Sequence, residues 1–135
     1  MATVLAVLLA LALLSGCSLR RDPRVTLVEK AIQVDIRGDF NGLRDLYTPE
    51  HREFLNARST MGATYRSDAG GQTPDIRHLA ANTVFNANGR AVVLASFDFY
   101  DTHKNHFVVA ATYNLQQYAS RWYILNYESK KHQVP

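Results

Sequence analysis

The sequence predicts an α+β domain, in which N-terminal helices pack on one face of an antiparallel sheet of four or more strands. Between residues 23 and 57, apolar side chains recur every three or four positions, which is the period of an amphipathic helix. From residue 75 onward the period becomes two, as in a half-buried strand. The segments after residue 75 are also joined by short turns, which favour an antiparallel meander.

The first helix is expected over residues 23–38. Asp22 can cap its start, Pro23 suits the first helical position, and Gly38 suits the left-handed residue after the end. One face of this helix is apolar and should be buried. Its members are Val25, Val28, Ile32 and Ile36.

Two shorter helices are expected next. The inner side of the second carries Phe40, Leu43, Leu46 and Tyr47. The third begins with Thr48 as N-cap and Pro49 at the first position, and it runs to about Ala57. We expect this third helix to bury Phe54 and Leu55. Residues 58–74 have no apolar period, and they are predicted to form a long loop that acts either as a lid over a pocket or as a flexible connector.

Four strands are expected in the second half of the chain. They span about residues 76–85, 91–100, 106–118 and 122–128. The sequence Asn86-Ala87-Asn88-Gly89 makes the first turn, because these residue types tolerate positive φ. Phe97 and Phe99 share one face of the second strand, and Phe107 and Tyr113 share one face of the third.

The only cysteine, Cys17, ends an uncharged apolar run that starts at Met1. A single cysteine can form no disulfide within the chain, and no nearby histidine would activate its thiol. The segment Leu14-Ser15-Gly16-Cys17 resembles the lipobox of bacterial lipoproteins. The resemblance implies cleavage before Cys17, a diacylglycerol on its sulfur and an acylated amino terminus. The alternative is an apolar run that is retained as a signal anchor.

These features predict three parts: a signal peptide over 1–16, a lipidated linker over 17–22 and one domain over 23–135. Ser18 stands where lipoproteins kept in the inner membrane usually have aspartate, so the resemblance favours the periplasmic face of an outer membrane. The expected localisation is therefore the bacterial cell envelope, with membrane lipid as a partner through acylated Cys17. Arg20, Arg21 and Arg24 follow closely and form either a solvated linker or contacts with anionic head groups.

The net charge of the chain is +3, and basic and acidic residues are interspersed. Nucleic-acid-binding domains concentrate Lys and Arg on one face or stripe. No such concentration is present, so nucleic acid is not expected as a partner.

The stretch from Gly38 to Glu50, which reads GDFNGLRDLYTPE, resembles the helix junction of the nuclear transport factor 2-like (NTF2-like) superfamily. The closing Arg121-Trp122-Tyr123-Ile124-Leu125 resembles the last strand of these domains. The resemblance implies a strongly bent sheet folded around the first helix, with a conical cavity between them. Lumazine-binding-like and cystatin-like folds are the alternatives. The superfamily holds both enzymes and non-catalytic domains, so the fold does not choose the function.

A catalytic site of the isomerase type would need a carboxylate base and hydroxyl donors in an apolar pocket. Asp98 and Tyr100 share a strand face, and Tyr113 and Tyr47 could supply further hydroxyls. No motif of the family's enzymes maps onto these residues. They are therefore weak candidates, because Asp98 can equally lie on a solvated face.

A metal site is not expected. His103 and His106 flank a turn with Asp101 nearby, but no third strong ligand is indicated and turn histidines in water explain the pattern. His78 and Asn82 share a face of the first strand, as a polar patch or an exposed edge. No cofactor is expected.

The sequence favours an envelope lipoprotein whose domain binds a small apolar ligand or acts as a scaffold. Aromatic side chains are numerous in the predicted sheet, so one of its faces can be covered by a second copy or an envelope protein partner. An isomerase- or dehydratase-like enzyme using Asp98 and a tyrosine, and an accessory component of a secretion or conjugation apparatus, are the alternatives. The residues expected to line a ligand pocket are Tyr47, Phe97, Phe99, Tyr113 and Trp122.

Overall fold

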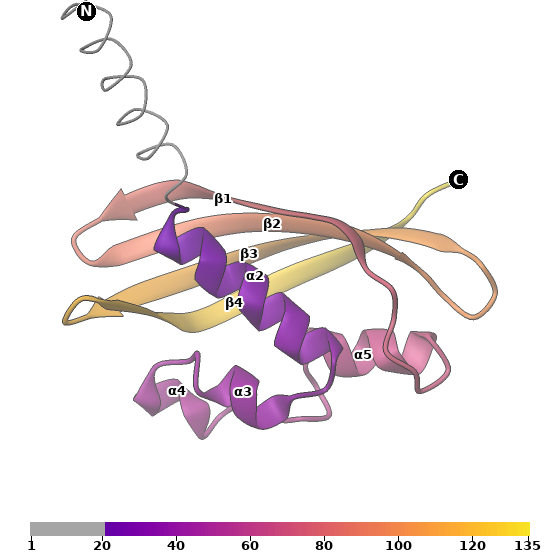
Figure 1. Cartoon of the computed structure of the whole chain (residues 1–135), viewed down its shortest axis with the longest axis horizontal. Helices are drawn as coiled ribbons and strands as arrows, with labels where there is room; N and C mark the ends of the chain where they lie inside the picture. Colours follow the sequence, from indigo (N-terminus) through magenta and orange to yellow (C-terminus); the bar gives the residue numbers. More distant parts are fainter. Residues whose placement is uncertain (1–20) are drawn as a thin grey trace, which may run out of the picture.

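The computed structural model describes residues 21–135, and the predicted signal peptide and Cys17 lie outside the described residues. Four helices precede four strands along the chain (Figure 1). The helices are α2 (Pro23–Ile36), α3 (Phe40–Arg44), α4 (Pro49–Arg52) and α5 (Met61–Asp68). The strands are β1 (Arg77–Ala87), β2 (Arg90–Tyr100), β3 (His106–Tyr118) and β4 (Arg121–Gln133). Within residues 21–135, no helix has the length and apolar character needed to cross a membrane.

The strands form one antiparallel sheet in the order β1-β2-β3-β4. Asn88 and Gly89 alone connect β1 to β2, and both have positive φ, 54° and 72°. This conformation suits a two-residue hairpin, because its twist matches that of the flanking strands. The turn after β3 also uses positive φ, at Ala119. The strand order is the meander that the short connections predict.

Helix α2 begins as its sequence predicts, with the Asp22 carboxylate accepting the backbone N–H of Arg24 at 3.0 Å and Pro23 in the first position. The helix lies across one face of the sheet, and α3, α4 and α5 flank it on that side (Figure 1). We call this the inner face. The other face of the sheet, the outer face, is not covered by any described element.

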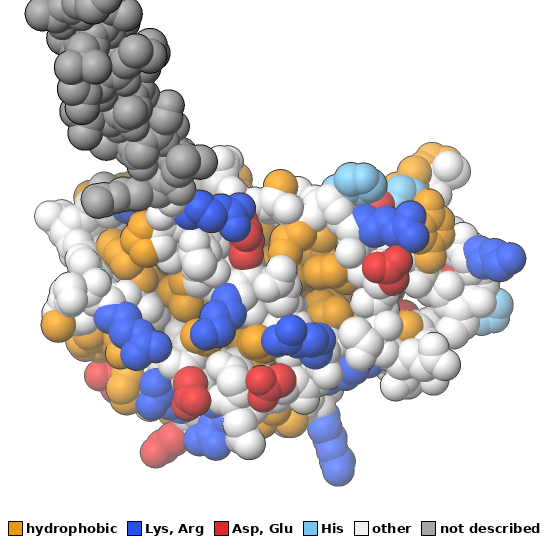
Figure 2. Space-filling model, viewed as in Figure 1, with side chains coloured by type: hydrophobic (Ala, Val, Ile, Leu, Met, Phe, Trp, Pro, Cys, Tyr) orange, Lys and Arg blue, Asp and Glu red, His pale blue; other side chains and the backbone are white. Residues whose placement is uncertain are grey.

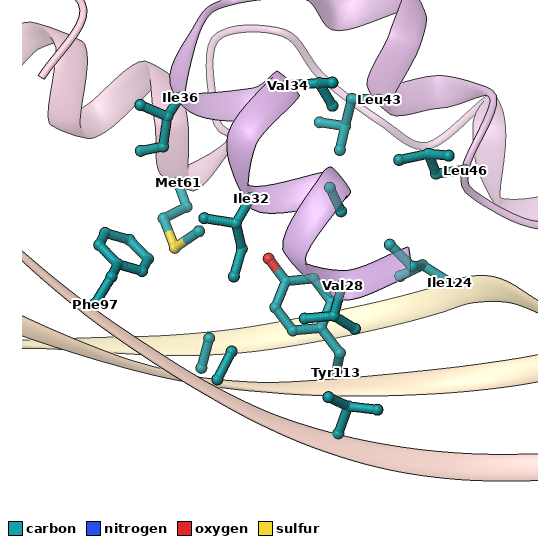
Figure 3. Packing of buried hydrophobic residues seen from close by; sticks show 14 of the residues in the cluster. Val28, Ile32, Val34, Ile36, Leu43, Leu46, Met61, Phe97, Tyr113 and Ile124 are labelled. Carbon is teal, nitrogen blue, oxygen red and sulfur yellow. The ribbon is translucent and has the colours of Figure 1, made fainter. Parts of the chain in front are cut away.

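The inner face is filled with side chains (Figure 3). Val28 and Ile32 of α2 meet Tyr113 of β3, whose ring points from the sheet toward the helix. Phe97 lies beside Met61, which comes from α5. Burial of such large apolar side chains supplies the main free energy of folding, about 1.5–3 kcal/mol for each aliphatic or aromatic residue.

Helix α5 packs directly against the end of α2 through one glycine. The carboxylate of Asp35 accepts the backbone N–H of Gly62 at 3.0 Å. Arg66 reaches back from α5 and donates to the backbone carbonyls of Asp35 and Ile36. A side-chain carbon on Gly62 would lie 2.2 Å from the carbonyl oxygen of Asp35, so only glycine allows this approach.

The predicted fold class, helices on a bent sheet in an NTF2-like cone, is wrong. The described chain is a four-stranded antiparallel sheet with a few short helices: after α2, with 14 residues, the others have only 5, 4 and 8. Where the cone would be open, Phe97, Phe99 and Tyr113 fill the space against α2. The sequence motifs that suggested the cone are helix caps and a strand aromatic, which many folds share.

Three local predictions are also corrected. The expected loop over 58–74 contains helix α5, which the sequence hid because only Met61, Gly62 and Tyr65 of its eight residues are buried. The third helix ends at Arg52 rather than near Ala57, and Phe54 lies outside it with 82% of its surface exposed. Strand β4 continues to Gln133 because its backbone pairs with β3 through a polar stretch that shows no alternation.

Candidate functional site

An apolar cavity lies beside β4, where the chain between α3 and α4 pairs with the edge of that strand. The backbone N–H of Thr48 donates to the carbonyl of Ile124 at 3.0 Å, and the N–H of Ile124 donates to the carbonyl of Leu46 at 2.8 Å. These two hydrogen bonds fix Tyr47 against the sheet. His51 of α4, with Phe54 and Leu55 after it, forms another wall of the cavity.

The cavity has a volume of about 250 Å³. Its lining is mainly apolar, with two polar residues. The lining residues are Tyr47, His51, Phe54, Leu55, Leu125, Asn126 and Tyr127. His51 is oriented by Thr48, whose hydroxyl lies 2.6 Å from its Nδ1. Asn126 is oriented by Asn114, whose amide donates to it at 2.7 Å. The chain therefore presents an apolar hollow with a few fixed polar groups, which is the usual construction of a small-ligand site.

Tyrosine hydroxyls lie behind this cavity. Tyr127 accepts the backbone N–H of Met61 at 2.8 Å and stacks on Tyr113, with ring centroids 5.1 Å apart. The hydroxyl of Tyr47 is buried and has no hydrogen-bond partner among residues 21–135. Burial, with the nearby Tyr127 and Asp35, raises the pKa of Tyr47. Tyr47 is therefore a neutral hydroxyl over the whole physiological range, able to donate or accept but not to ionise.

A second polar constellation lies on the outer face, at the end of the sheet opposite the β1–β2 turn. The Asp98 carboxylate bridges two imidazoles, with His78 Nδ1 2.7 Å from Oδ1 and His106 Nε2 2.8 Å from Oδ2. His106 also stacks on Tyr100, with centroids 4.7 Å apart. His78 reaches Asp98 because it has φ of 56° at a register shift in β1, a conformation that non-glycine residues seldom adopt.

The chemistry open to this constellation is limited. Hydrogen bonds from His78 and then from His106 lower the pKa of Asp98, which makes it a weak base. Within residues 21–135, no hydroxyl or thiol nucleophile hydrogen-bonds to either imidazole. The described part of the chain also contains no group of three or more His, Cys, Asp or Glu residues placed to hold a metal ion. The arrangement fixes the start of β1 to β2 and β3.

Replacing Asp98 with asparagine is expected to destabilise the domain in a pH-dependent way. A carboxyl group whose pKa is lower in the folded state stabilises above its unfolded pKa of about 3.9, and this stabilisation is lost as pH falls through the folded value. The difference in Tm between the wild type and Asp98→Asn should therefore be largest near neutral pH. It should become smaller as the pH falls below about 4. Asp45→Asn, at an exposed helix end, is the control. A constant difference at all pH values would contradict the expectation.

The predicted catalytic residues are not brought together. Asp98 faces outward with a 14% exposed side chain, whereas Tyr113 is buried on the inner face of the same sheet. The sheet itself therefore separates these two groups. Tyr100 shares the outer face with Asp98, but its ring stacks on His106 rather than lining a pocket.

The predicted pocket residues are divided among three places. Phe97, Phe99 and Tyr113 are core residues, and Tyr65 packs against both phenylalanines. Trp122 lines a separate groove beside the start of α2. Only Tyr47 lines the cavity beside β4.

Two residues that complete these sites could not be identified from the sequence. The apolar pattern predicts a buried helical position for Phe54, and Pro49 at the start of α4 gives no sign that the helix ends after four residues. The pattern of β1 predicts His78 in a polar patch or at an exposed edge, but strict alternation does not reveal the register shift that brings it to Asp98. His103 and Asp101 instead form the turn before β3, where the Asp101 carboxylate accepts the backbone N–H groups of His103 and Asn105.

The comparisons with known proteins concern the fold. No protein family model matches the chain, and no curated protein does. The solution structure of a SEC-C motif containing protein from Rhodopseudomonas palustris is similar, with a TM-score of 0.57 and 15% sequence identity over 80% of each chain. This likeness is the finding that overturns the predicted fold class. At this level of identity it bears on the fold alone.

Proposed function

We propose that this chain is a lipid-anchored protein of the bacterial envelope whose domain binds a small apolar ligand without catalysis. The observation that carries the ligand proposal is Phe54, a large apolar side chain left 82% exposed at the wall of the apolar cavity beside β4. An exposed aromatic ring next to an apolar hollow favours an occupant that contacts both.

The size and lining of the cavity define the ligand. A volume of about 250 Å³ is at the small end for ligand sites, so the occupant is a small molecule or one end of a longer amphiphile. Leu55, Leu125 and the ring of Tyr127 would contact its apolar body. His51 and Asn126 would orient a single polar group. No charged residue lines the cavity, which favours an uncharged ligand.

The anchor proposal rests on the sequence Leu14-Ser15-Gly16-Cys17. Two or three acyl chains at Cys17 would hold the chain stably at a membrane, whereas one chain binds marginally. We expect Cys17→Ser to move the protein from the detergent phase to the aqueous phase on phase partitioning. Intact mass spectrometry of the wild type should then show acyl mass on a chain that begins at Cys17. Retention of Cys17→Ser in the membrane would favour a signal anchor instead.

The ligand proposal is tested with a fluorescent apolar probe, N-phenyl-1-naphthylamine, and with native mass spectrometry of protein extracted gently from its membrane. Phe54→Ala should weaken probe binding about tenfold, because loss of a contacting aromatic ring is worth about 1.4 kcal/mol or more. Its stability should change by less than about 0.5 kcal/mol, since the side chain is exposed.

The matched control is Leu94→Ala, which removes an exposed apolar side chain from the outer face of β2. It should bind the probe as the wild type does. Equal binding by Phe54→Ala and the wild type would contradict the cavity as the site. A protein that carries no small molecule but travels with another protein would instead favour the scaffold alternative, for which the uncovered outer face is the contact surface.

A further inference from the structure

One end of the domain, which we call the entry end, combines the start of the described chain with two turns of the sheet. It comprises residues 21–30 at the start of α2 and the two turns β1–β2 and β3–β4 with the strand residues beside them, 87–90 and 118–122. All three lie at the same end of the molecule, away from the β2–β3 turn (Figure 1). The Asp98 constellation lies at the other end, and the cavity beside β4 has a different lining.

The entry end contains a groove of about 270 Å³ between α2 and the β3–β4 turn. Its apolar lining comes from Pro23, Leu27, Leu46 and Trp122, and its cations are Lys30 and Arg121. An apolar floor with two cations at its rim matches an anionic amphiphile better than it matches a neutral apolar molecule.

The cations of the groove are not neutralised by neighbouring acids. Arg21 pairs with Glu29 at 3.2 Å, and Arg24 pairs with Asp22 at 2.7 Å. Within residues 21–135, by contrast, no carboxylate lies within ion-pair distance of Lys30 or Arg121.

Arg90, the first residue of β2, adds a third cation that has no carboxylate within ion-pair distance among residues 21–135. Glu50 accepts the hydroxyl of Tyr118, which ends β3, at 3.0 Å. The cations of the groove and its rim are therefore available to bind an anionic group. Figure 2 shows Lys and Arg side chains on the helical side of the molecule, interspersed with Asp and Glu side chains and with apolar surface.

Aromatic and apolar side chains surround these cations. Arg121 lies over the ring of Tyr123, 5.2 Å from its centre, and Tyr118 packs edge-on against the same ring. Val84 and Phe85, near the end of β1, are 53% and 51% exposed. Tyrosine, tryptophan and arginine combine an apolar body with a polar tip, and they are favoured where protein meets the polar region of a membrane.

The sequence places this end close to the proposed anchor. Arg21 follows Cys17 by only four positions, and a fully extended chain of that length spans at most about 14 Å. If Cys17 carries lipid, the entry end is therefore held within reach of the phospholipid head groups, whereas the rest of the sheet can extend away from them.

We propose that the entry end docks on the membrane surface, with the groove of Lys30, Arg121 and Trp122 holding the head group of an anionic phospholipid. This inference rests on the proposed lipid anchor for its geometry but concerns a different surface of the chain. Docking fixes the orientation of the domain, so that the β2–β3 turn and the Asp98 constellation face away from the bilayer.

Trp122 is the only tryptophan, so its fluorescence reports directly on the groove. The full chain is extracted from membranes and reconstituted in vesicles of phosphatidylcholine, with or without phosphatidylglycerol, that carry brominated acyl chains. Quenching of Trp122 should be strong with phosphatidylglycerol and weak without it, and high salt should reduce it. Lys30→Gln/Arg121→Gln should lower the ratio of docked to undocked domain about 25-fold, at about fivefold for each cation near the surface.

The control variant is Arg77→Gln/Lys130→Gln, which removes two exposed cations far from the entry end and should quench as the wild type does. Equal quenching in both lipid mixtures, or in both double variants, would overturn the inference. Intact mass spectrometry of the same sample separates the two proposals. If the chain is acylated but the quenching does not depend on anionic lipid, the anchor proposal stands and the docking surface is wrong. If the chain carries no acyl mass but the quenching depends on anionic lipid, the docking surface stands and the anchor proposal is wrong.

Discussion

Gly62→Ala is expected to lower the free energy of unfolding by about 3 kcal/mol or more, the upper range for overpacking in a well-packed interior. The added carbon would lie 2.2 Å from the backbone carbonyl oxygen of Asp35 and 2.4 Å from its Oδ1. The carbonyl oxygen belongs to the backbone of α2 and cannot turn aside as a side chain can, so helix α5 would have to move away from α2. That movement breaks the hydrogen bond between Gly62 and Asp35 as well.

Urea unfolding followed by circular dichroism measures this effect. Ser67→Ala, at an exposed position on the same helix, is the control and should change the stability by less than about 0.5 kcal/mol. A Gly62→Ala protein with the wild-type midpoint would show that α5 does not pack on α2 as described.

Substitution of Asp35 is expected to have the second large effect on stability. The effect of Asp35→Ala should not depend on pH, whereas that of Asp35→Asn should. Asp35→Ala removes the acceptor of the buried Gly62 N–H, and we expect a loss of about 2–3 kcal/mol at every pH. Asp35→Asn keeps an acceptor of similar shape but cannot ionise. Its effect should therefore depend on pH.

The sign follows from the direction of the pKa shift. Burial raises the pKa of Asp35, and its hydrogen bonds with Thr60 and Gly62 and the charge of Arg66 offset this only in part. The folded state consequently binds the proton more tightly than the unfolded state, whose pKa is about 3.9. The stability that Asp35 contributes is complete below that value and is lost as pH rises through the folded pKa.

The stability of Asp35→Asn relative to the wild type should therefore increase as pH rises from about 4 toward neutrality. Urea unfolding of both proteins at a series of pH values measures the difference. A relative stability that falls over the same interval would show that the ionised carboxylate is the favoured form in the folded domain.

Local chemistry made part of this fold predictable. Asp22 and Pro23 mark the start of α2 because a side-chain acceptor and a fixed φ act within one turn of helix. Asn88 and Gly89 mark the first hairpin because positive φ is a property of the residue itself. Helix α5 could not be predicted in this way, because its packing depends on one close approach between Gly62 and Asp35, which are far apart in the sequence.

The candidate sites were less predictable for the same reason. Tyr47 was identified as a pocket residue, but its place in the cavity depends on the pairing of residues 46–48 with Ile124. The separation of Asp98 from Tyr113 follows from strand alternation, yet the partners of Asp98 follow from an irregularity in β1. Overall shape was the largest error, because caps and strand aromatics do not determine how far helices extend over a sheet.

Strand β4 is the last strand of the described sheet, and residues 46–48 pair with its free edge only around Ile124. An uncovered strand edge invites pairing with the same edge of another molecule, and positive charge is one defence against it. Lys130 and Lys131 stand in succession near the end of β4, where Lys131 also pairs with Asp68 at 2.8 Å. Proteins tethered in one plane meet at high effective concentration. For a chain anchored as proposed, these side chains would therefore keep crowded neighbours from aggregating through their sheets.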